Sequence, residues 1–318
     1  MIPLSHLTRS FILVVFSLGG LIATFLPGVS FAEEGRIVIL LSQDEAAYQD
    51  IQAGFRAYLH QQGVAAQFEE YQLQNSAIKA IQALDDAKQK GVHLLFTLGT
   101  AATQPALKEA GEIPVVAALG ASAEELRNAA NATGVVLDFP VQTQFQWMQK
   151  LLPAAKNIGI LYNAHKTGDK VEDAKHTART LGFTVTAQEV KTTQELTRAL
   201  DKLANEARVL WGITDHTIYS PQTAESILLF SFRNRIPFAG LSLAWVKAGA
   251  LYALDRDYRD LGIQCGELAV QMLRGAKAKT LPPVAPRKVV YALNLKTAQH
   301  MKLDIAQALI DGAQQVIQ

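Results

Sequence analysis

Several polar side chains that could hold a ligand stand directly after apolar runs of this 318-residue chain. In the second half of the chain these residues are Asn163, Asp215, His216, Ser242 and Asp257. Asp215 follows the apolar run 209–213, and its carboxylate suits a ligand ammonium or hydroxyl group. Capping of the next turn is the alternative role for Asp215, because Asp favours such positions. His216 suits an exposed loop as well as it suits stacking on a ligand.

The first half of the chain offers a matching set of residues, which are Ser42, Gln43, Thr100, Ala101 and Gly120. We expect Thr100 to cap a helix that begins at Ala101. The free backbone N–H groups of a first helical turn, together with the positive end of the helix dipole, favour an anion such as a carboxylate. Capping alone is the other role open to Thr100, and it is compatible with ligand contact.

The sequence contains few motifs that indicate catalysis or metal binding. The sequence contains no phosphate-binding Gly-rich loop, no HExxH pair and no Cys/His metal spacing. The run 240–244 resembles a nucleophile elbow around Ser242, and Asp255 and His300 follow in the order that a serine hydrolase needs. Ala244, however, stands where that motif uses Gly. We therefore predict no enzymatic activity, no cofactor and no metal site, with a serine hydrolase as the less favoured alternative.

Alternating apolar runs and amphipathic stretches must position these residues. The runs 36–41 and 157–162 are continuous, as in parallel strands that are buried on both faces. Residues 44–62 follow the first run with helical spacing. The alternation of apolar runs and amphipathic stretches begins again after Pro153. The chain is therefore predicted to form two α/β lobes, each with a doubly wound parallel sheet. Such sheets bind ligands beyond the carboxyl ends of their strands, so we expect the site between the two lobes.

The first 32 residues have the pattern of a secretory signal peptide. Arg9 precedes the apolar run 11–26, and the small residues Ser30 and Ala32 stand where signal peptidase requires them. An uncleaved membrane anchor is the alternative, but this run is shorter than the roughly 20 residues that span a bilayer. We expect cleavage after Ala32, and no Cys stands near that position to carry a lipid.

The net charge and the number of cysteines indicate which partners the protein can bind and in which cellular compartment it acts. The chain has 30 basic residues, one of which is Arg9, and 29 acidic residues, so the mature chain has no net charge. No basic field is present to attract nucleic acid. The single Cys265 cannot form an intrachain disulfide and lies in a helical pattern that favours burial. Export without a lipid or a disulfide indicates the periplasm of a Gram-negative bacterium.

A series of motifs along the mature chain resembles one known family. The motifs are Thr100–Gln104, Leu151–Pro153 before Ile158–Asn163, Thr214–Asp215, Gly249–Leu251, Asp257–Tyr258, Leu261–Gly262 and Asn294–Ala298. In this order they are similar to those of ABC transporter substrate-binding proteins of the tryptophan/tyrosine-transport type, which have the type I periplasmic-binding fold. The resemblance covers nearly all of the mature chain.

This resemblance implies a three-strand hinge between the lobes. The first lobe then comprises residues 33–138 and 257–280, and the second lobe comprises residues 139–256 and 281–318. The chain would return to the second lobe after the pair Pro282–Pro283.

The resemblance also carries an expectation about the ligand. Members that bind amino acids hold the ligand carboxylate at the helix terminus that matches Thr100 and use the acidic position that matches Asp215. Three departures limit this transfer. Gly120–Ala121 and His216 stand where the family commonly has Thr-Asp and Asn, and the first loop, residues 42–48, also differs. An aromatic amino acid is therefore one candidate ligand among several.

We expect a monomeric, periplasmic component of an ABC importer, which closes on a small molecule and delivers it to an inner-membrane ABC permease. A sensor that passes its closed state to a signalling receptor is the main alternative. A transcription regulator shares the two lobes, but the signal peptide and the missing basic helix-turn-helix disfavour it.

Overall fold

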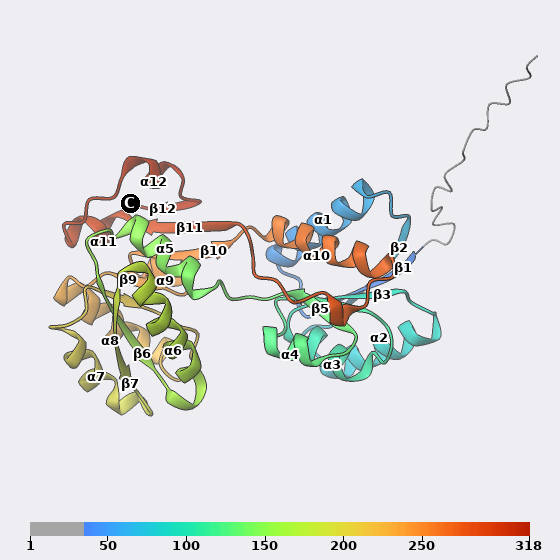
Figure 1. The fold of residues 1–318 in the computed structure, drawn as a ribbon, viewed down its shortest axis with the longest axis horizontal. Coiled ribbons are helices and arrows are strands. Elements are labelled where there is room, and N and C mark those ends of the chain that lie inside the picture. The colour runs from blue at the N-terminus through green and yellow to red at the C-terminus, as the bar shows by residue number, and fades with distance from the viewer. Residues whose placement is uncertain (1–34) are drawn as a thin grey trace, which may run out of the picture. The chain divides into compact units, whose positions relative to one another are not determined.

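The computed structural model describes residues 35–318 of the chain. The predicted signal peptide, residues 1–32, lies outside these residues. Within residues 35–318, no helix combines the length and the apolar character that a membrane crossing requires. The described chain forms two β-sheets, and each sheet with its helices makes one lobe (Figure 1).

The first lobe is built on a five-stranded parallel sheet in the order β2-β1-β3-β4-β5. Its strands are β1 (Gly35–Leu41), β2 (Ala66–Gln72), β3 (Leu94–Leu98), β4 (Val115–Ala118) and β5 (Ala132–Val135). In β1, Ile37 and Ile39 enter one hydrophobic core, while Val38 and Leu40 enter another. Because successive side chains of a strand point to opposite faces, an uninterrupted apolar run is what a strand between two cores needs.

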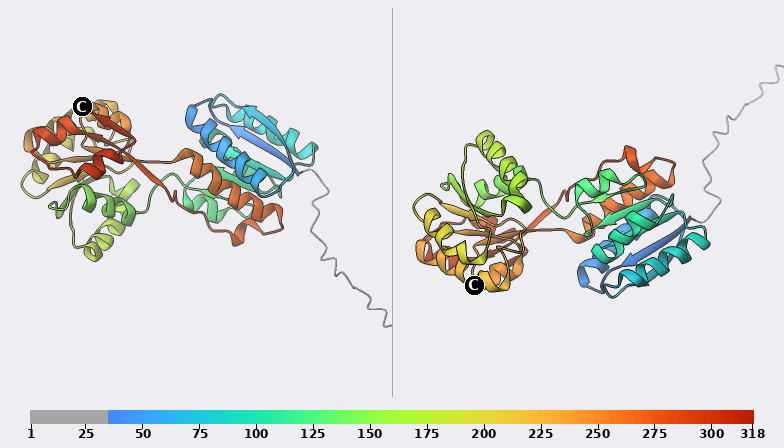
Figure 2. Two further views of the ribbon diagram at one scale, coloured as in Figure 1. Left: turned by 90° about the horizontal axis from the view of Figure 1, so that it is seen from above. Right: turned by 90° about the horizontal axis from the view of Figure 1, so that it is seen from below.

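Helices on both faces make the first lobe doubly wound. They are α1 (Ala46–Gln61), α2 (Ala77–Gln89), α3 (Thr100–Glu109), α4 (Ala123–Asn128) and α10 (Tyr258–Leu273). Helix α10 comes from much later in the chain, yet it lies alongside α1, as the left view of Figure 2 shows. Two glycines permit this approach. A Cβ atom on Gly54 of α1 would lie 2.0 Å from the carbonyl oxygen of Arg259, and one on Gly262 of α10 would lie 1.9 Å from that of Ile51.

The second lobe is built on a seven-stranded sheet in the order β12-β11-β10-β9-β8-β6-β7. Its strands are β6 (Asn157–Tyr162), β7 (Thr184–Glu189), β8 (Val209–Trp211), β9 (Phe238–Gly240), β10 (Tyr252–Arg256), β11 (Val289–Asn294) and β12 (Gln315–Ile317). Neighbouring strands are parallel except β10 and β11, which are antiparallel. Its helices are α5 (Val141–Leu151), α6 (Ala164–Leu181), α7 (Leu196–Leu203), α8 (Pro221–Asn234), α9 (Leu243–Ala248), α11 (Leu295–His300) and α12 (Gln307–Asp311). Two doubly wound α/β lobes are the fold class that the sequence predicts.

The chain passes between the two sheets three times, after β5, after β10 and before β11. Before the third crossing, the chain first runs along the edge of the first sheet, where the N–H of Val284 donates to the carbonyl of Gly134 at 3.0 Å. Gln264 on α10 holds the same segment by donating to the carbonyl of Ala285 at 3.0 Å. The bond of Val284 gives a backbone group of edge strand β5 a partner, and the bond from Gln264 holds the segment to α10.

Candidate ligand-binding site

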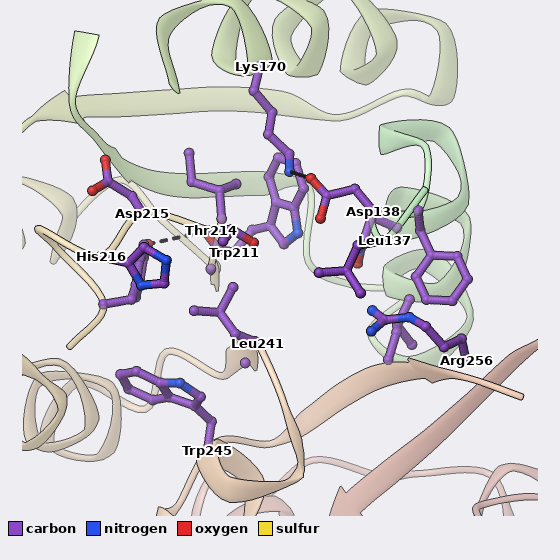
Figure 3. Close-up of a pocket in the computed structure, with 17 residues that line it drawn as sticks. Leu137, Asp138, Lys170, Trp211, Thr214, Asp215, His216, Leu241, Trp245 and Arg256 are labelled. Atoms are coloured by element: carbon purple, nitrogen blue, oxygen red, sulfur yellow. Dashed lines mark hydrogen bonds and ion pairs between the residues drawn. The ribbon is translucent and has the colours of Figure 1, made fainter. Parts of the chain in front are cut away.

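A cavity of about 320 Å³ lies at one edge of the second sheet (Figure 3). It is lined by the segments that follow β8 and β9, by the end of β10, and by residues 137–139 of the first crossing. Strands β8, β9 and β10 run parallel to one another, so their carboxyl ends meet at this edge. The cavity therefore lies where open α/β sheets hold small ligands, and its volume suits one.

Apolar side chains form one wall of the cavity. Trp245 on α9 packs edge-on against Phe238 and Tyr219, with ring centroids 5.5 Å and 6.1 Å apart. Tyr219 is buried, whereas Trp245 and the neighbouring Leu241 keep part of their surface exposed. The indole of Trp245 is held by this aromatic cluster and can pack against a flat, apolar part of a ligand.

Asp215 follows β8 and is one of the predicted site residues that line the cavity. The residue is only 4% exposed. Its Oδ1 atom accepts a hydrogen bond from the N–H of Thr217 at 2.9 Å, so one carboxylate oxygen caps the following turn. Its Oδ2 atom is buried and has no hydrogen-bond partner within residues 35–318. An unpaired buried carboxylate oxygen is costly, and a donor on a ligand or a water molecule would satisfy it.

Arg256 ends β10 and lies on the opposite side of the cavity from Asp215 in Figure 3. Its side chain is 16% exposed, and the carboxylate Oδ1 of Asp255 lies 3.7 Å from its Nη1. The guanidinium stands over the ring of Phe139, 5.6 Å from the ring centroid. Its Nε atom is buried and, like Asp215 Oδ2, has no hydrogen-bond partner in the described part of the chain.

Lys170 on α6 brings a second cation to the cavity. Its Nζ atom lies 2.7 Å from Oδ2 of Asp138, which belongs to the first crossing. The two side chains are 26% and 55% exposed, so solvent screens this pair and leaves it worth about 0–1 kcal/mol. With Arg256 and Asp215, the lining carries two cations and two carboxylates. This balance suits a ligand that itself carries charges of both signs.

The other predicted residues of the second lobe have different surroundings. His216 lines the cavity and is exposed. Asn163 is buried and caps α6, because its Oδ1 accepts from the N–H of His165 at 3.1 Å. Ser242 is the exposed residue before α9, and Asp257 caps α10 by accepting from the N–H of Asp260 at 2.9 Å. Asn163, Ser242 and Asp257 do not line the cavity.

In the first lobe, the predicted capping role of Thr100 is wrong. Thr100 is the first residue of α3, and Gly99, with a φ of 85°, occupies the capping position before it. The capping hydrogen bond comes from another strand end, since the Oγ of Ser42 accepts from the N–H of Ala102 at 2.9 Å. The side chain of Thr100 is exposed, and within residues 35–318 the N–H groups of Thr100 and Ala101 have no partner.

Gln43 and Gly120 complete the set at the carboxyl edge of the first sheet. Gln43 is half-buried after β1. Gly120 is buried after β4, where a Cβ atom would lie 2.1 Å from Oγ1 of Thr103, so close packing requires glycine there. Ser42, Gln43, Thr100, Ala101 and Gly120 thus follow neighbouring parallel strands, but none of them lines the 320 Å³ cavity.

The residues of the hydrolase alternative are not brought together. Ser242 precedes α9, Asp255 accepts from the backbone N–H of Arg256 at 2.8 Å, and His300 stacks on Phe232. In the described part of the chain, no hydrogen bond links any two of the three. Residues 35–318 also contain no cluster of His, Cys, Asp and Glu side chains that could hold a metal ion.

Sequence reasoning missed Arg256, Trp245, Lys170 and Asp138 as cavity residues. A signal for Arg256 was present, because it lies between Asp255 and Asp257 at a strand end, and alternation along a strand gives it the opposite face from both. No comparable signal existed for Trp245, since the short helix α9 has no clear periodicity of its own.

Two α/β lobes, joined by three crossings and bearing a cavity at a strand-end edge, are the architecture that two-lobed solute-binding proteins have. The family model for ABC transporter substrate binding proteins matches residues 36–317, so the chain belongs to this family. Its members bind small solutes and are not enzymes. The family expected from the motifs is thereby confirmed.

Known proteins similar to this chain agree with this assignment. The tyrosine-binding protein of Clostridioides difficile (strain R20291) is 27% identical over 200 residues, which are 59% of this chain and 57% of that protein. The chain thus matches little more than half the length of this curated relative.

Two solved structures share the fold. A ligand-free, open substrate-binding protein with adhesive properties from Clostridium difficile matches with a TM-score of 0.74 and 20% identity, over 89% of this chain and 99% of the other. An ABC domain in complex with L-Trp from Streptococcus pneumonia matches with a TM-score of 0.59 and 24% identity, over 90% and 100% of the two chains.

Proposed function

We propose that this chain is exported to the periplasm, where it binds an amino acid or a related compound and delivers it to an inner-membrane ABC permease. The signal-peptide pattern of residues 1–32 supports export. Membership of the substrate-binding family supports delivery to a permease rather than to a signalling receptor. Equal numbers of acidic and basic residues in the mature chain support a protein that does not bind nucleic acid.

The observation that carries the ligand proposal is the unpaired Oδ2 of Asp215. A buried carboxylate at a strand end, with one oxygen unsatisfied, is suited to a ligand ammonium group. The apolar wall at Trp245 and Leu241 would accept the side chain of the same ligand. A tyrosine-binding relative and a structural neighbour in complex with L-Trp support an amino acid as the ligand class.

We further propose that the ligand is enclosed between two lobes that close by hinge motion. Residues 33–138 and 257–280 belong to the first lobe in this proposal, and the hydrogen bonds of Val284 and Ala285 support extending that second segment to about residue 285. Ser42, Gln43, Thr100, Ala101 and Gly120 then contribute the first lobe's side of the site. Asp215 and His216 contribute the second lobe's side.

Calorimetric titration tests the ligand proposal. Protein purified after expression of the full chain is titrated with L-tyrosine, L-tryptophan, L-phenylalanine and L-glutamate, and native mass spectrometry identifies any compound that co-purifies. We expect at least one of the amino acids to bind. Asp215→Asn should weaken that binding roughly tenfold or more, because a charge-assisted hydrogen bond is worth about 1.5–3 kcal/mol. Asp173→Asn, on the exposed face of α6, is the matched control and should leave the affinity unchanged. Equal affinities of wild type and Asp215→Asn would contradict the role of Asp215.

A further inference from the structure

Arg256 differs from the other charged residues because most of its side chain is buried at the cavity, while few acceptors in the described part of the protein balance its positive charge. The side chain is 16% exposed, and the Nε atom has no hydrogen-bond partner within residues 35–318. Desolvating a guanidinium is expensive unless anions or hydrogen-bond acceptors surround it.

The groups around Arg256 within the protein do not complete its environment. Asp255 Oδ1 lies 3.7 Å from Nη1, and it already accepts from the backbone N–H of Arg256 at 2.8 Å and from the hydroxyl of Tyr258 at 3.2 Å. Tyr258 also interacts with the guanidinium, but a neutral hydroxyl does not balance a charge. The ring of Phe139 adds a modest cation–π attraction at 5.6 Å. The guanidinium can therefore still form hydrogen bonds and an ion pair with an anion that enters the cavity.

A second cation, Lys170, lines the cavity together with Arg256. Lys170 lines the same cavity and pairs with Asp138, whose side chain is 55% exposed and so shares its charge with solvent. Figure 3 shows Asp138 and Arg256 on one side of the cavity and Asp215 on the other. The cavity thus has an end that favours an anion and an end that favours a cation.

We infer that Arg256 binds the carboxylate of the ligand and is the residue that selects for ligands with this carboxylate over those without it. This inference rests on the proposed amino-acid-binding function and deepens it. It also differs from the site that the resemblance implied, in which the helix terminus at Thr100 holds the carboxylate. The planar fork of a guanidinium matches a carboxylate with two parallel, charge-assisted hydrogen bonds, whereas a helix terminus offers neutral N–H donors and only a partial positive charge.

The test compares ligand pairs that differ in one carboxylate. L-tyrosine and tyramine differ in the α-carboxylate, whereas L-glutamate and L-glutamine differ in a side-chain carboxylate. Glutarate carries carboxylates and no ammonium group. Affinities are measured by calorimetry for wild type, Arg256→Gln and Arg256→Lys. Arg198→Gln, an exposed arginine on α7, is the matched control.

We expect wild type to prefer, in at least one pair, the member that carries the additional carboxylate. Arg256→Gln should reduce this preference roughly ten- to a hundredfold, because hydrogen bonds to a charged group are worth about 1.5–3 kcal/mol. In the pair that shows this preference, binding of the member without that carboxylate should stay within about twofold, which shows that the variant is folded. Arg256→Lys should fall between wild type and Arg256→Gln, since it keeps the charge and loses the fork.

Thr100→Pro tests the alternative that the N-terminus of α3 holds the ligand carboxylate. Proline is tolerated at the first position of a helix, so this variant removes one N–H group without breaking α3. A lost preference in Thr100→Pro with an intact preference in Arg256→Gln would overturn the inference in favour of the helix terminus. Wild type without any preference for a carboxylate would overturn it as well.

The glutarate titration separates this inference from the proposed function. Glutarate binding that depends on Arg256, with no amino acid bound, would support the inference and contradict the amino-acid proposal. Amino-acid binding that depends on Asp215 but not on Arg256 would contradict only the inference. If wild type binds none of these five compounds and neither L-tryptophan nor L-phenylalanine, both are wrong.

Discussion

Ser42 shows how a single hydroxyl group can stabilise an element that is distant in the sequence. Its Oγ accepts from the N–H of Ala102, sixty positions later, and caps α3 in place of the residue next to that helix. Ser42 is 2% exposed, so without its hydroxyl the N–H of Ala102 would lose a buried partner. We expect Ser42→Ala to lower the free energy of unfolding by about 1–2 kcal/mol. Urea unfolding followed by circular dichroism measures this loss.

Thr100→Ala is the control for the Ser42 prediction, because local spacing assigns the cap to Thr100. Its side chain is exposed, and the structure gives it no capping bond. The free energy of unfolding should change by less than about 0.5 kcal/mol. A larger loss in Thr100→Ala than in Ser42→Ala would restore Thr100 as the cap of α3.

The candidate site could be predicted only in part at this scale. Asp215 and His216 follow from a simple rule, since polar residues directly after a buried strand lie at the ligand-binding edge of a parallel sheet. Asn163 and Asp257 obey the same rule, yet their side chains cap helices, because a strand-end position is also a helix-start position in an α/β fold. Which of the two roles a residue has depends on contacts that its own segment does not contain.

At the scale of elements, the pairing of α1 with α10 rests on glycine. The absent side chains of Gly54 and Gly262 let each helix touch the backbone of the other. Gly262→Ala would place a methyl group 1.9 Å from a backbone oxygen, so the helices must separate and lose packing. We expect a loss of about 2–4 kcal/mol in the free energy of unfolding, somewhat above the usual range for overpacking, because the obstacle is backbone. Thermal and urea unfolding both report it.

Gly168 on α6 is the matched control for the glycine prediction. A Cβ atom there meets nothing within 4 Å. Gly168→Ala should leave stability unchanged or raise it by up to about 1 kcal/mol, because alanine restricts the unfolded chain. Similar losses in both variants would mean that helix geometry, and not the contact between α1 and α10, explains the effect.

Helix α4 provides a prediction about pH. The pKa of Glu125 lies below its ordinary value of 4.5, first because the backbone N–H of Ser122 donates to its carboxylate, and further because Ser122 and Gln104 side chains donate to it. A lowered pKa in the folded state means that the stabilisation is present above the unfolded pKa and is lost as the pH falls through the folded pKa. Acidification below about pH 4.5 should therefore weaken this capping box by at most about 0.5 kcal/mol, because the carboxylate is exposed and screened.

Glu125→Gln tests the pH prediction by removing the titrating group. The difference in unfolding free energy between wild type and Glu125→Gln should shrink between pH 7 and pH 3.5. A difference that stays constant over this range would contradict the role of the Glu125 carboxylate.

The elements themselves were largely predictable, with one class of exceptions. Buried parallel strands have continuous apolar runs, so β1 and β6 could be read directly from the sequence. Strands β11 and β12 were not predicted, because β11 pairs antiparallel with β10 and its identity depends on where the chain returns to the second sheet. A non-local contact of the same kind joins Val284 to the edge strand β5 of the first sheet.

At the scale of the whole molecule, the two lobes have separate hydrophobic cores, and three crossings join them. Arg287 ties the third crossing to α10, since its guanidinium forms a fork with Asp260 through contacts of 2.9 Å and 3.1 Å. The Asp260 side chain is 4% exposed, so it depends on this pairing. We therefore expect the second and third crossings to move together when the lobes rotate.

Hinge closure is the last prediction, and the single cysteine makes it measurable. Cys265 is fully buried, and burial raises the pKa of its thiol, so labelling reagents should not reach a reactive thiolate there. Labels can then be placed at the exposed positions Glu124→Cys in the first lobe and His165→Cys in the second. Saturation with the amino acid that binds most tightly should shift the distance distribution between these labels toward shorter values, because the ligand favours the closed population. Labels at Lys79→Cys and Glu124→Cys, both in the first lobe, should show no change. An unchanged distribution between the lobes at saturation would mean that the ligand binds without closure, and delivery to a permease would then need another signal of occupancy.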